Sequence, residues 1–139
     1  MFSAITLTFV DDAISTTPES TLAALAAISN VGTLMLGGLD RGYDFTQLAQ
    51  TLAGYNIPNL VLFPESGTKI AQELEKYSVY HPRVLETTSM TDAVAFAYQN
   101  TPEEMVCLLS TASPSYTLWK NFEEKGDEFQ KIVQELGQS

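Results

Sequence analysis

The stretch STASPSYTLWKNFEEKGDEF, Ser110–Phe129, is the most informative part of this chain. It follows a short apolar run, Val106–Leu109, which has the length and composition of a buried strand. An aromatic and charged segment with helical spacing comes next, and we expect Gly126 to break it. In an α/β domain, such a strand-to-helix turn presents unpaired backbone N–H groups and hydroxyls to an anion above the strand end. The stretch therefore predicts a site for a small carboxylate or phosphate.

Composition and charge narrow the class of protein. The chain has 139 residues, 45% of them hydrophobic and 17% charged, which is typical of one soluble globular domain. A formal charge of -10 with only 7 lysines and arginines argues against a nucleic-acid partner. The sequence has no apolar run near the roughly 18 residues of a membrane span, and its start lacks a signal-peptide pattern. We therefore expect a cytoplasmic protein with no membrane partner, in keeping with its single cysteine.

Strand and helix patterns alternate along the whole chain. Strands are expected at 5–10, 32–36, 59–63, 83–86 and 105–109, and helices at 18–30, 45–55, 66–77, 89–98, 115–125 and 127–136. Because the strands are continuous apolar runs, both faces of their sheet should be covered. We predict a single α/β domain over residues 1–139. It should be a three-layer Rossmann-like fold with a mostly parallel sheet of five or six strands, room for one antiparallel edge strand, and helices on both faces.

Polar residues gather where the predicted strands end, which is where such folds bind ligands. These positions are Asp12–Thr17, Gly37–Asp44, Pro64–Gly67 and Ser110–Ser115. Asp12 fits a strand-end cap as well as a ligand contact. Thr16 or Thr17 fits the N-cap of a helix that begins at Pro18. Arg41 fits a solvated charge as well as the partner of an anion, so residue type alone leaves both interpretations open.

Several catalytic and nucleotide-binding motifs are missing from the sequence. It contains no GxxxxGK[ST] loop, and Gly37–Gly42 does not match GxGxxG. His81 is the only histidine and follows the wrong kind of element, so we expect neither a Ser/His/Asp nor a Cys/His arrangement. We expect Cys107 to be an inert core residue. Lys120 and Lys125, which lie among acidic residues, are interpreted as part of a salt-bridged helix face. The chain is therefore predicted to carry binding groups rather than to catalyse a reaction by itself.

Three blocks of sequence together resemble a known family. They are Asp11–Glu19 (DDAISTTPE), Leu36–Phe45 (LGGLDRGYDF) and Leu108–Phe129. Their order and spacing resemble those of the C-terminal domain of the Mur ligases, most closely the D-glutamate-adding members of that family. The resemblance extends over nearly the whole chain, and the third block is the most specific.

The resemblance implies a three-domain, ATP-dependent ligase of peptidoglycan synthesis. An N-terminal domain would hold the UDP-sugar, a central domain would hold ATP and Mg²⁺, and the C-terminal domain would bring D-glutamate. In the family reaction, the carboxylate of UDP-N-acetylmuramoyl-L-alanine is activated as an acyl phosphate, which the D-glutamate amine attacks. Only the third domain would be present here, without a cofactor or metal of its own, monomeric and inactive in isolation.

The resemblance also implies roles for individual residues. The positions that match D-glutamate contacts are Thr16, Arg41, Ser115 and Phe122. Asp12 matches an aspartate that lies near the nucleotide when the domains close. Two departures matter: Ile14 stands where the family has a lysine, and Arg41 replaces another lysine while keeping its charge. They leave open a relative with another amino-acid substrate, and a non-catalytic α/β binding module remains the contrasting hypothesis.

Overall fold

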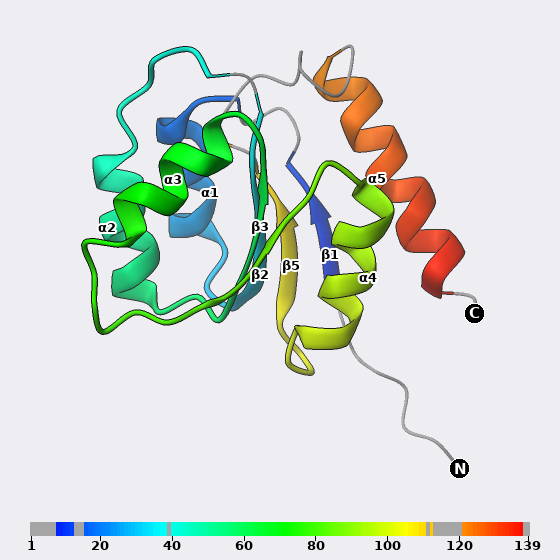
Figure 1. Ribbon diagram of the computed structural model, residues 1–139. Coiled ribbons are helices and arrows are strands. Elements are labelled where there is room, and N and C mark those ends of the chain that lie inside the picture. The colour runs from blue at the N-terminus through cyan, green and yellow to red at the C-terminus, as the bar shows by residue number, and fades with distance from the viewer. Residues whose placement is uncertain (1–7, 13–15, 39, 111, 113–120, 138–139) are drawn as a thin grey trace.

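The computed structural model describes residues 8–12, 16–38, 40–110, 112 and 121–137. Its strands are β1 (Thr8–Asp11), β2 (Val31–Gly37), β3 (Asn59–Phe63), β4 (Arg83–Glu86) and β5 (Val106–Leu109). Its helices are α1 (Pro18–Ala27), α2 (Thr46–Tyr55), α3 (Ser66–Leu74), α4 (Met90–Asn100) and α5 (Phe122–Gly137). The strands form one sheet in the order β1-β5-β2-β3-β4, and every neighbouring pair in the described residues is parallel (Figure 1).

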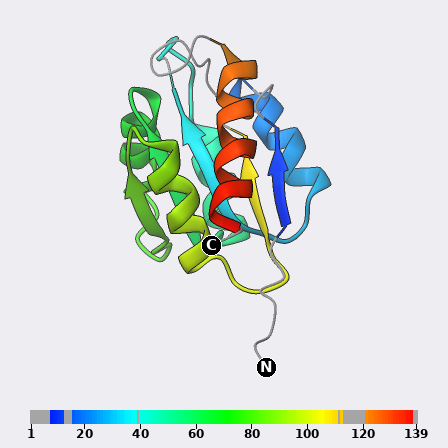
Figure 2. The same cartoon turned by 90° about the vertical axis from the view of Figure 1, so that its right-hand side faces the viewer.

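Helices cover both faces of this sheet. Helices α1, α2 and α3 pack on one face, and α4 and α5 pack on the other (Figures 1 and 2). Side chains alternate along the central strands, so Leu34 and Leu36 of β2 enter the first core while Met35 enters the second. Buried on both sides, such strands are continuous apolar runs, as the sequence indicated. The predicted three-layer α/β fold is confirmed.

The strand order produces a switch point at one edge of the sheet. The helices that follow β1, β2 and β3 lie on one face, whereas those that follow β4 and β5 lie on the other. Strand β5 lies between β1 and β2. The helix that follows β5 lies on one face of the sheet, and the helices that follow β1 and β2 lie on the other. Ligands of open α/β sheets bind at such switch points, beyond the carboxyl ends of the strands. The fold therefore directs attention to the ends of β1, β5 and β2.

The start of α1 follows the predicted capping pattern. Thr17 is the N-cap in extended conformation, and its Oγ1 accepts a hydrogen bond of 3.2 Å from the backbone N–H of Ser20. Pro18 occupies the first helical position, where its missing N–H costs nothing. The hydroxyl cap thus fixes where the loop after β1 ends.

Helix α5 differs from the prediction. It continues through Gly126, so the expected break there is wrong. The reason is a close approach: a Cβ on residue 126 would lie 2.7 Å from Oδ2 of Asp11, at the end of β1. A side chain at position 126 would therefore have to displace the Asp11 carboxylate. The predicted helical residues 115–120 lie outside the described residues.

Among the residues that the structure describes, no helix is both long enough and apolar enough to cross a membrane.

Candidate functional site

The two adjacent acids at the end of β1, Asp11 and Asp12, point to opposite sides of the sheet. The backbone N–H of Asp12 bonds to the carbonyl of Leu109 at 2.8 Å, which extends the pairing of β1 with β5 by one residue. Successive residues of an extended chain face opposite sides. Asp12 accordingly contacts Ser110, whereas Asp11 contacts α5 through Gln130. The two carboxylates at the end of β1 therefore contact different parts of the fold: Asp12 contacts the residue after β5, and Asp11 contacts α5.

A buried pair of hydroxyls supports Asp12. Ser110, directly after β5, donates from its Oγ to Oδ2 of Asp12 at 2.8 Å. Thr21 of α1 lies with its Oγ1 3.0 Å from the Ser110 Oγ and 3.1 Å from the Ser110 carbonyl oxygen. Both Ser110 and Thr21 are fully buried, at 0% exposure. The half-buried Asp12 carboxylate is thus connected to β5 and α1 by a continuous hydrogen-bonded chain.

A buried lysine lies on the side of Asp11. Lys125 of α5 is 0% exposed, and its burial lowers its pKa from 10.5 to about 8, an effect that the charge of Asp11 opposes in part. The interpretation of Lys125 as part of a salt-bridged helix face did not include this burial. The spacing contained the signal: Lys125 stands four residues before Phe129, which is buried in the core. Residues at that spacing share one face of a helix.

The loop that follows β2 is fastened to the start of α3. The carbonyl of Gly38 accepts hydrogen bonds from the N–H groups of Glu65, at 2.7 Å, and Ser66, at 2.9 Å. The N–H of Asp40 in turn donates to Oε1 of Glu65 at 3.1 Å. These contacts join the carboxyl ends of β2 and β3, so the first residues of the loop have a defined path.

Asp40 shapes the turn around Arg41. Its carboxylate accepts a hydrogen bond of 2.9 Å from the N–H of Gly42 and forms an ion pair of 3.2 Å with Lys69. The Gly42 hydrogen bond, with a smaller contribution from Lys69, holds the pKa of Asp40 below its usual value. Arg41 lies in this turn and is exposed. The loop is therefore organised by its neighbours while the guanidinium side chain reaches the surface.

Three of the sequence-predicted site residues lie at one edge of the sheet. Asp12 and Thr16 belong to the connection that follows β1, and Arg41 belongs to the connection that follows β2. Because the sheet is parallel, the carboxyl ends of these strands meet on the same edge. The backbone of Phe122 begins α5, and its side chain is outside the description. Ser115 and Ile14 lie outside the described residues.

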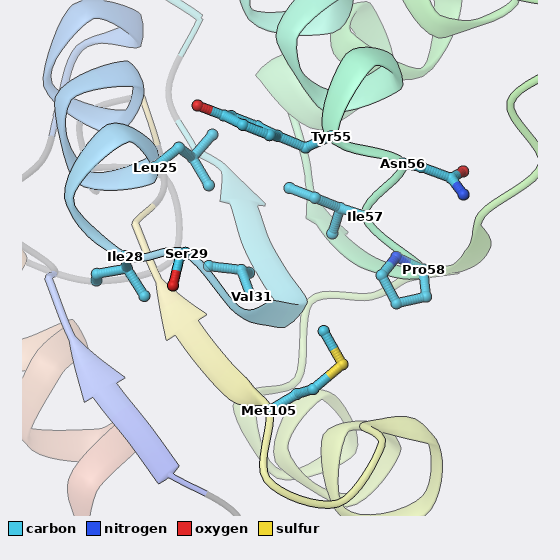
Figure 3. Close-up of a pocket in the computed structure, with 9 residues that line it drawn as sticks. All are labelled: Leu25, Ile28, Ser29, Val31, Tyr55, Asn56, Ile57, Pro58 and Met105. Atoms are coloured by element: carbon cyan, nitrogen blue, oxygen red, sulfur yellow. The ribbon is translucent and has the colours of Figure 1, made fainter.

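Two cavities lie away from these residues. One of about 110 Å³ lies at the opposite, amino edge of the strands, between Leu25, Tyr55 and Met105 (Figure 3). Another of about 410 Å³ lies beyond the carboxyl ends of β3 and β4, with Thr68 and Glu86 in its wall. The first is remote from the acid pair, and the second shares its edge. Most of the predicted residues that the structure describes lie instead at the carboxyl ends of β1, β5 and β2.

Comparison with known proteins identifies relatives of the chain, although no family model matches it. A UDP-N-acetylmuramoylalanine–D-glutamate ligase from Natranaerobius thermophilus is 34% identical over 129 residues, which is 93% of this chain and 27% of the relative. A ligase of the same name from Thermoanaerobacter sp. (strain X514) is 32% identical over 92% of the chain and 28% of the relative. A UDP-N-acetylmuramoyl-L-alanine–L-glutamate ligase from Salinispora tropica is 36% identical over 93% of the chain and 28% of the relative.

These similarities identify the class of the protein. The chain is an α/β domain homologous to part of a ligase. It spans little more than a quarter of the length of the curated relatives that it matches. The ligases concerned are the UDP-N-acetylmuramoylalanine–D-glutamate ligases, and the match in size is consistent with their C-terminal domain. The resemblance to the Mur ligases seen in the sequence is confirmed.

Proposed function

We propose that this chain is the amino-acid-binding domain of an ATP-dependent ligase that adds D-glutamate to UDP-N-acetylmuramoyl-L-alanine in peptidoglycan synthesis. The observation that carries the proposal is the similarity of 92–93% of the chain to ligases of that name. The arrangement of the site supports it, since the loops of Asp12, Thr16 and Arg41 leave one edge of the sheet. The domain would hold the amino acid and close over the reacting groups.

Charge explains why Arg41 is central to this proposal. D-Glutamate carries two carboxylates, and a chain with a formal charge of -10 needs a local cation to hold them. A guanidinium binds a carboxylate through two parallel hydrogen bonds, which gives orientation as well as affinity. Thr16, at the entrance to α1, would add a hydroxyl donor, as would Ser115, and the backbone at Phe122 would complete the site. Together they would fix the amine in line with the acyl phosphate.

ATP and Mg²⁺ would be held mainly by other domains of the ligase. The sequence lacks the GxxxxGK[ST] loop that cradles nucleotide phosphates. Asp12 would approach the nucleotide only when the domains close, and closure would exclude water from the reacting groups. The isolated domain would therefore bind glutamate weakly and would not turn over. We also propose that the protein acts as a monomer in the cytoplasm.

A second candidate, L-glutamate as the amino acid, has a specific observation in its favour. Two relatives named UDP-N-acetylmuramoyl-L-alanine–L-glutamate ligase, from Salinispora tropica and Micromonospora sp. (strain ATCC 39149), are 36% and 35% identical to the chain. Those identities are as high as the 31–34% of the relatives named for D-glutamate. Arg41 would pair with the side-chain carboxylate of either enantiomer, so the placement of the amine would decide between them. Assaying the complete ligase with each enantiomer separates the two candidates.

An arginine substitution tests the site in the complete ligase. Arg41→Ala should raise the KM for glutamate by roughly a hundredfold, because it removes a charge-assisted pair, and leave the KM for ATP nearly unchanged. Arg83→Ala is the matched control: Arg83 is also exposed but lies at the amino end of β4, where it donates to Oδ1 of Asn100 at 3.0 Å. An unchanged glutamate KM in Arg41→Ala removes Arg41 from the site.

The domain assignment has its own test, the natural length of the encoded protein. The proposal expects an upstream region with a GxxxxGK[ST] motif, because a ligase needs an ATP-binding domain. A natural protein without such a region would favour the non-catalytic binding module instead.

A further inference from the structure

The hydrogen bonds around Ser110 run in one direction. Its hydroxyl has a single proton, and that proton lies between Oγ and Oδ2 of Asp12, which are 2.8 Å apart. An ionised carboxylate only accepts hydrogen bonds, so Ser110 must be the donor there. Thr21 donates from its Oγ1 to the Ser110 carbonyl oxygen at 3.1 Å, and the same hydroxyl lies 3.0 Å from the Ser110 Oγ. Thr21 therefore holds Ser110, and Ser110 donates to the Asp12 carboxylate.

These hydrogen bonds are more than a carboxylate at the end of a strand needs. A half-exposed aspartate is solvated by water, and a polar group buried without a partner is costly. Here a hydroxyl with 0% exposure, that of Ser110, donates to the acid, and a second one, that of Thr21, contacts Ser110. Hydrogen bonds also hold the backbone. The N–H of Ser110 donates to the carbonyl of Met35 in β2 at 3.3 Å, and the N–H of Asp12 donates to the carbonyl of Leu109 at 2.8 Å. The carboxylate is thus fixed to β5, β2 and α1 together.

We infer that Ser110 and Thr21 are positioning residues that hold the Asp12 carboxylate in one orientation, ready to accept a hydrogen bond from the nucleotide of the closed ligase. The orientation follows from the contacts within this chain, while the identity of the donor rests on the function proposed above. Ser110 acts directly on the carboxylate, and Thr21 acts through Ser110. Neither is expected to touch the ligand.

Kinetics of the complete ligase test the inference. Ser110→Ala removes the hydroxyl donor to Asp12 and should raise the KM for ATP roughly tenfold, with the KM for glutamate unchanged. Thr21→Val should have a smaller effect in the same direction, and Thr21→Ser, which keeps the hydroxyl, should restore the original KM. Equal changes in both KM values would overturn the inference, because they would indicate a general loss of structure.

A matched control separates orientation from stability. Thr33 and Thr101 form another buried pair of hydroxyls, 2.6 Å apart, near the amino edge of the strands. Thr101→Val removes a comparable buried hydrogen bond and should lower the melting temperature without changing the KM for ATP. Coupling gives a further criterion: Ser110→Ala should add little to the defect of Asp12→Ala, since its target is then gone. Additive losses in the double variant would show that Ser110 acts by another route.

A spectroscopic measurement on this chain does not depend on the ligase reaction. Three-bond NMR couplings across χ1 of Asp12 should report a single rotamer in the unsubstituted chain and averaging among rotamers in Ser110→Ala, but no averaging in Thr101→Val. A single rotamer in Ser110→Ala would overturn the positioning role whatever the ligand is. If averaging is seen while the KM for ATP stays constant, the orientation stands and the nucleotide contact is rejected.

Discussion

Gly126 of α5 packs directly against the carboxylate of Asp11, so closely that a Cβ on residue 126 would lie 2.7 Å from Oδ2 and 3.1 Å from Oδ1. The same carboxylate accepts a hydrogen bond from the side-chain amide of Gln130, one turn further along the helix. It is also the charge that favours the protonated form of the buried Lys125. The end of β1 and the first half of α5 are therefore held together by one acid and one glycine.

Gly126→Ala should destabilise the protein although alanine is the better helix former. Helix propensity alone would add up to about 1 kcal/mol. The new methyl group, however, would displace the Asp11 carboxylate from Gln130 and from Lys125, and the net free energy of unfolding should fall by about 1 kcal/mol. In an Asp11→Ala background the same substitution should instead stabilise, because only the propensity remains. Urea denaturation of the four variants measures this; the same sign in both backgrounds would contradict the role of the contact.

Lys125 should make the stability of the protein depend on pH. Its folded-state pKa of about 8 lies below its ordinary value of 10.5, so between these values the unfolded chain binds more protons. The free energy of unfolding therefore rises with pH from about 8 upward, by at most about 3 kcal/mol for this group. Lys125→Met should be more stable than the unsubstituted chain at pH 7, and this advantage should shrink by pH 10.

Cys107 changes the pH dependence of stability in the opposite direction to Lys125. The difference in free energy of unfolding between Lys125→Met and the unsubstituted chain is therefore the quantity to measure. Burial raises the pKa of its thiol, so only the unfolded chain releases the proton near pH 9, and stability falls above that pH. This contribution is common to both proteins and cancels when Lys125→Met is compared with the unsubstituted chain by urea denaturation at pH 7 to 10. Parallel stability curves would show that Lys125 titrates normally.

Much of the fold could be predicted because its signals are local. Strands β2, β3 and β5 are continuous apolar runs, and the Thr17-Pro18 pair marks the start of α1. The position of β5 between β1 and β2 could not be predicted, since the pairing joins segments far apart in the sequence and depends on the packing of the whole sheet. The expectation of a helix break at Gly126 was wrong for a related reason: the carboxylate that a side chain there would meet belongs to Asp11, on another element.

The placement of the candidate site residues could be predicted in part. Asp12, Thr16 and Arg41 follow strands, and parallel strands share their carboxyl edge, so their placement at that edge follows from the sequence. The partners of Asp12 were not predictable, because Thr21 reaches Ser110 only through the packing of α1 on the sheet. The burial of Lys125 was not expected because its charge was given more weight than its spacing from Phe129.

Gly37 should be among the least replaceable residues in the described chain. It has a φ of 109°, which side chains rarely adopt, and a Cβ there would lie 2.0 Å from the carbonyl oxygen of Phe63. Gly37→Ala should reduce the free energy of unfolding by at least about 3 kcal/mol. Gly54 is the control, because it lies within α2 with nothing within 4 Å of its added Cβ. Gly54→Ala should stabilise by up to about 1 kcal/mol, and similar urea midpoints for the two variants would refute this account.

Asp40 should matter for glutamate binding more than its surface ion pair suggests. It bonds to the N–H of Gly42 at 2.9 Å and so closes the turn that presents Arg41, whereas its ion pair with Lys69 is exposed and weak. In the complete ligase, Asp40→Ala should raise the KM for glutamate several-fold, because the turn loses its hydrogen bond to a charged group. Lys69→Met, which removes the ion pair but keeps the turn, should leave that KM within about twofold. If both variants behave alike, the ion pair rather than the Gly42 hydrogen bond positions Arg41.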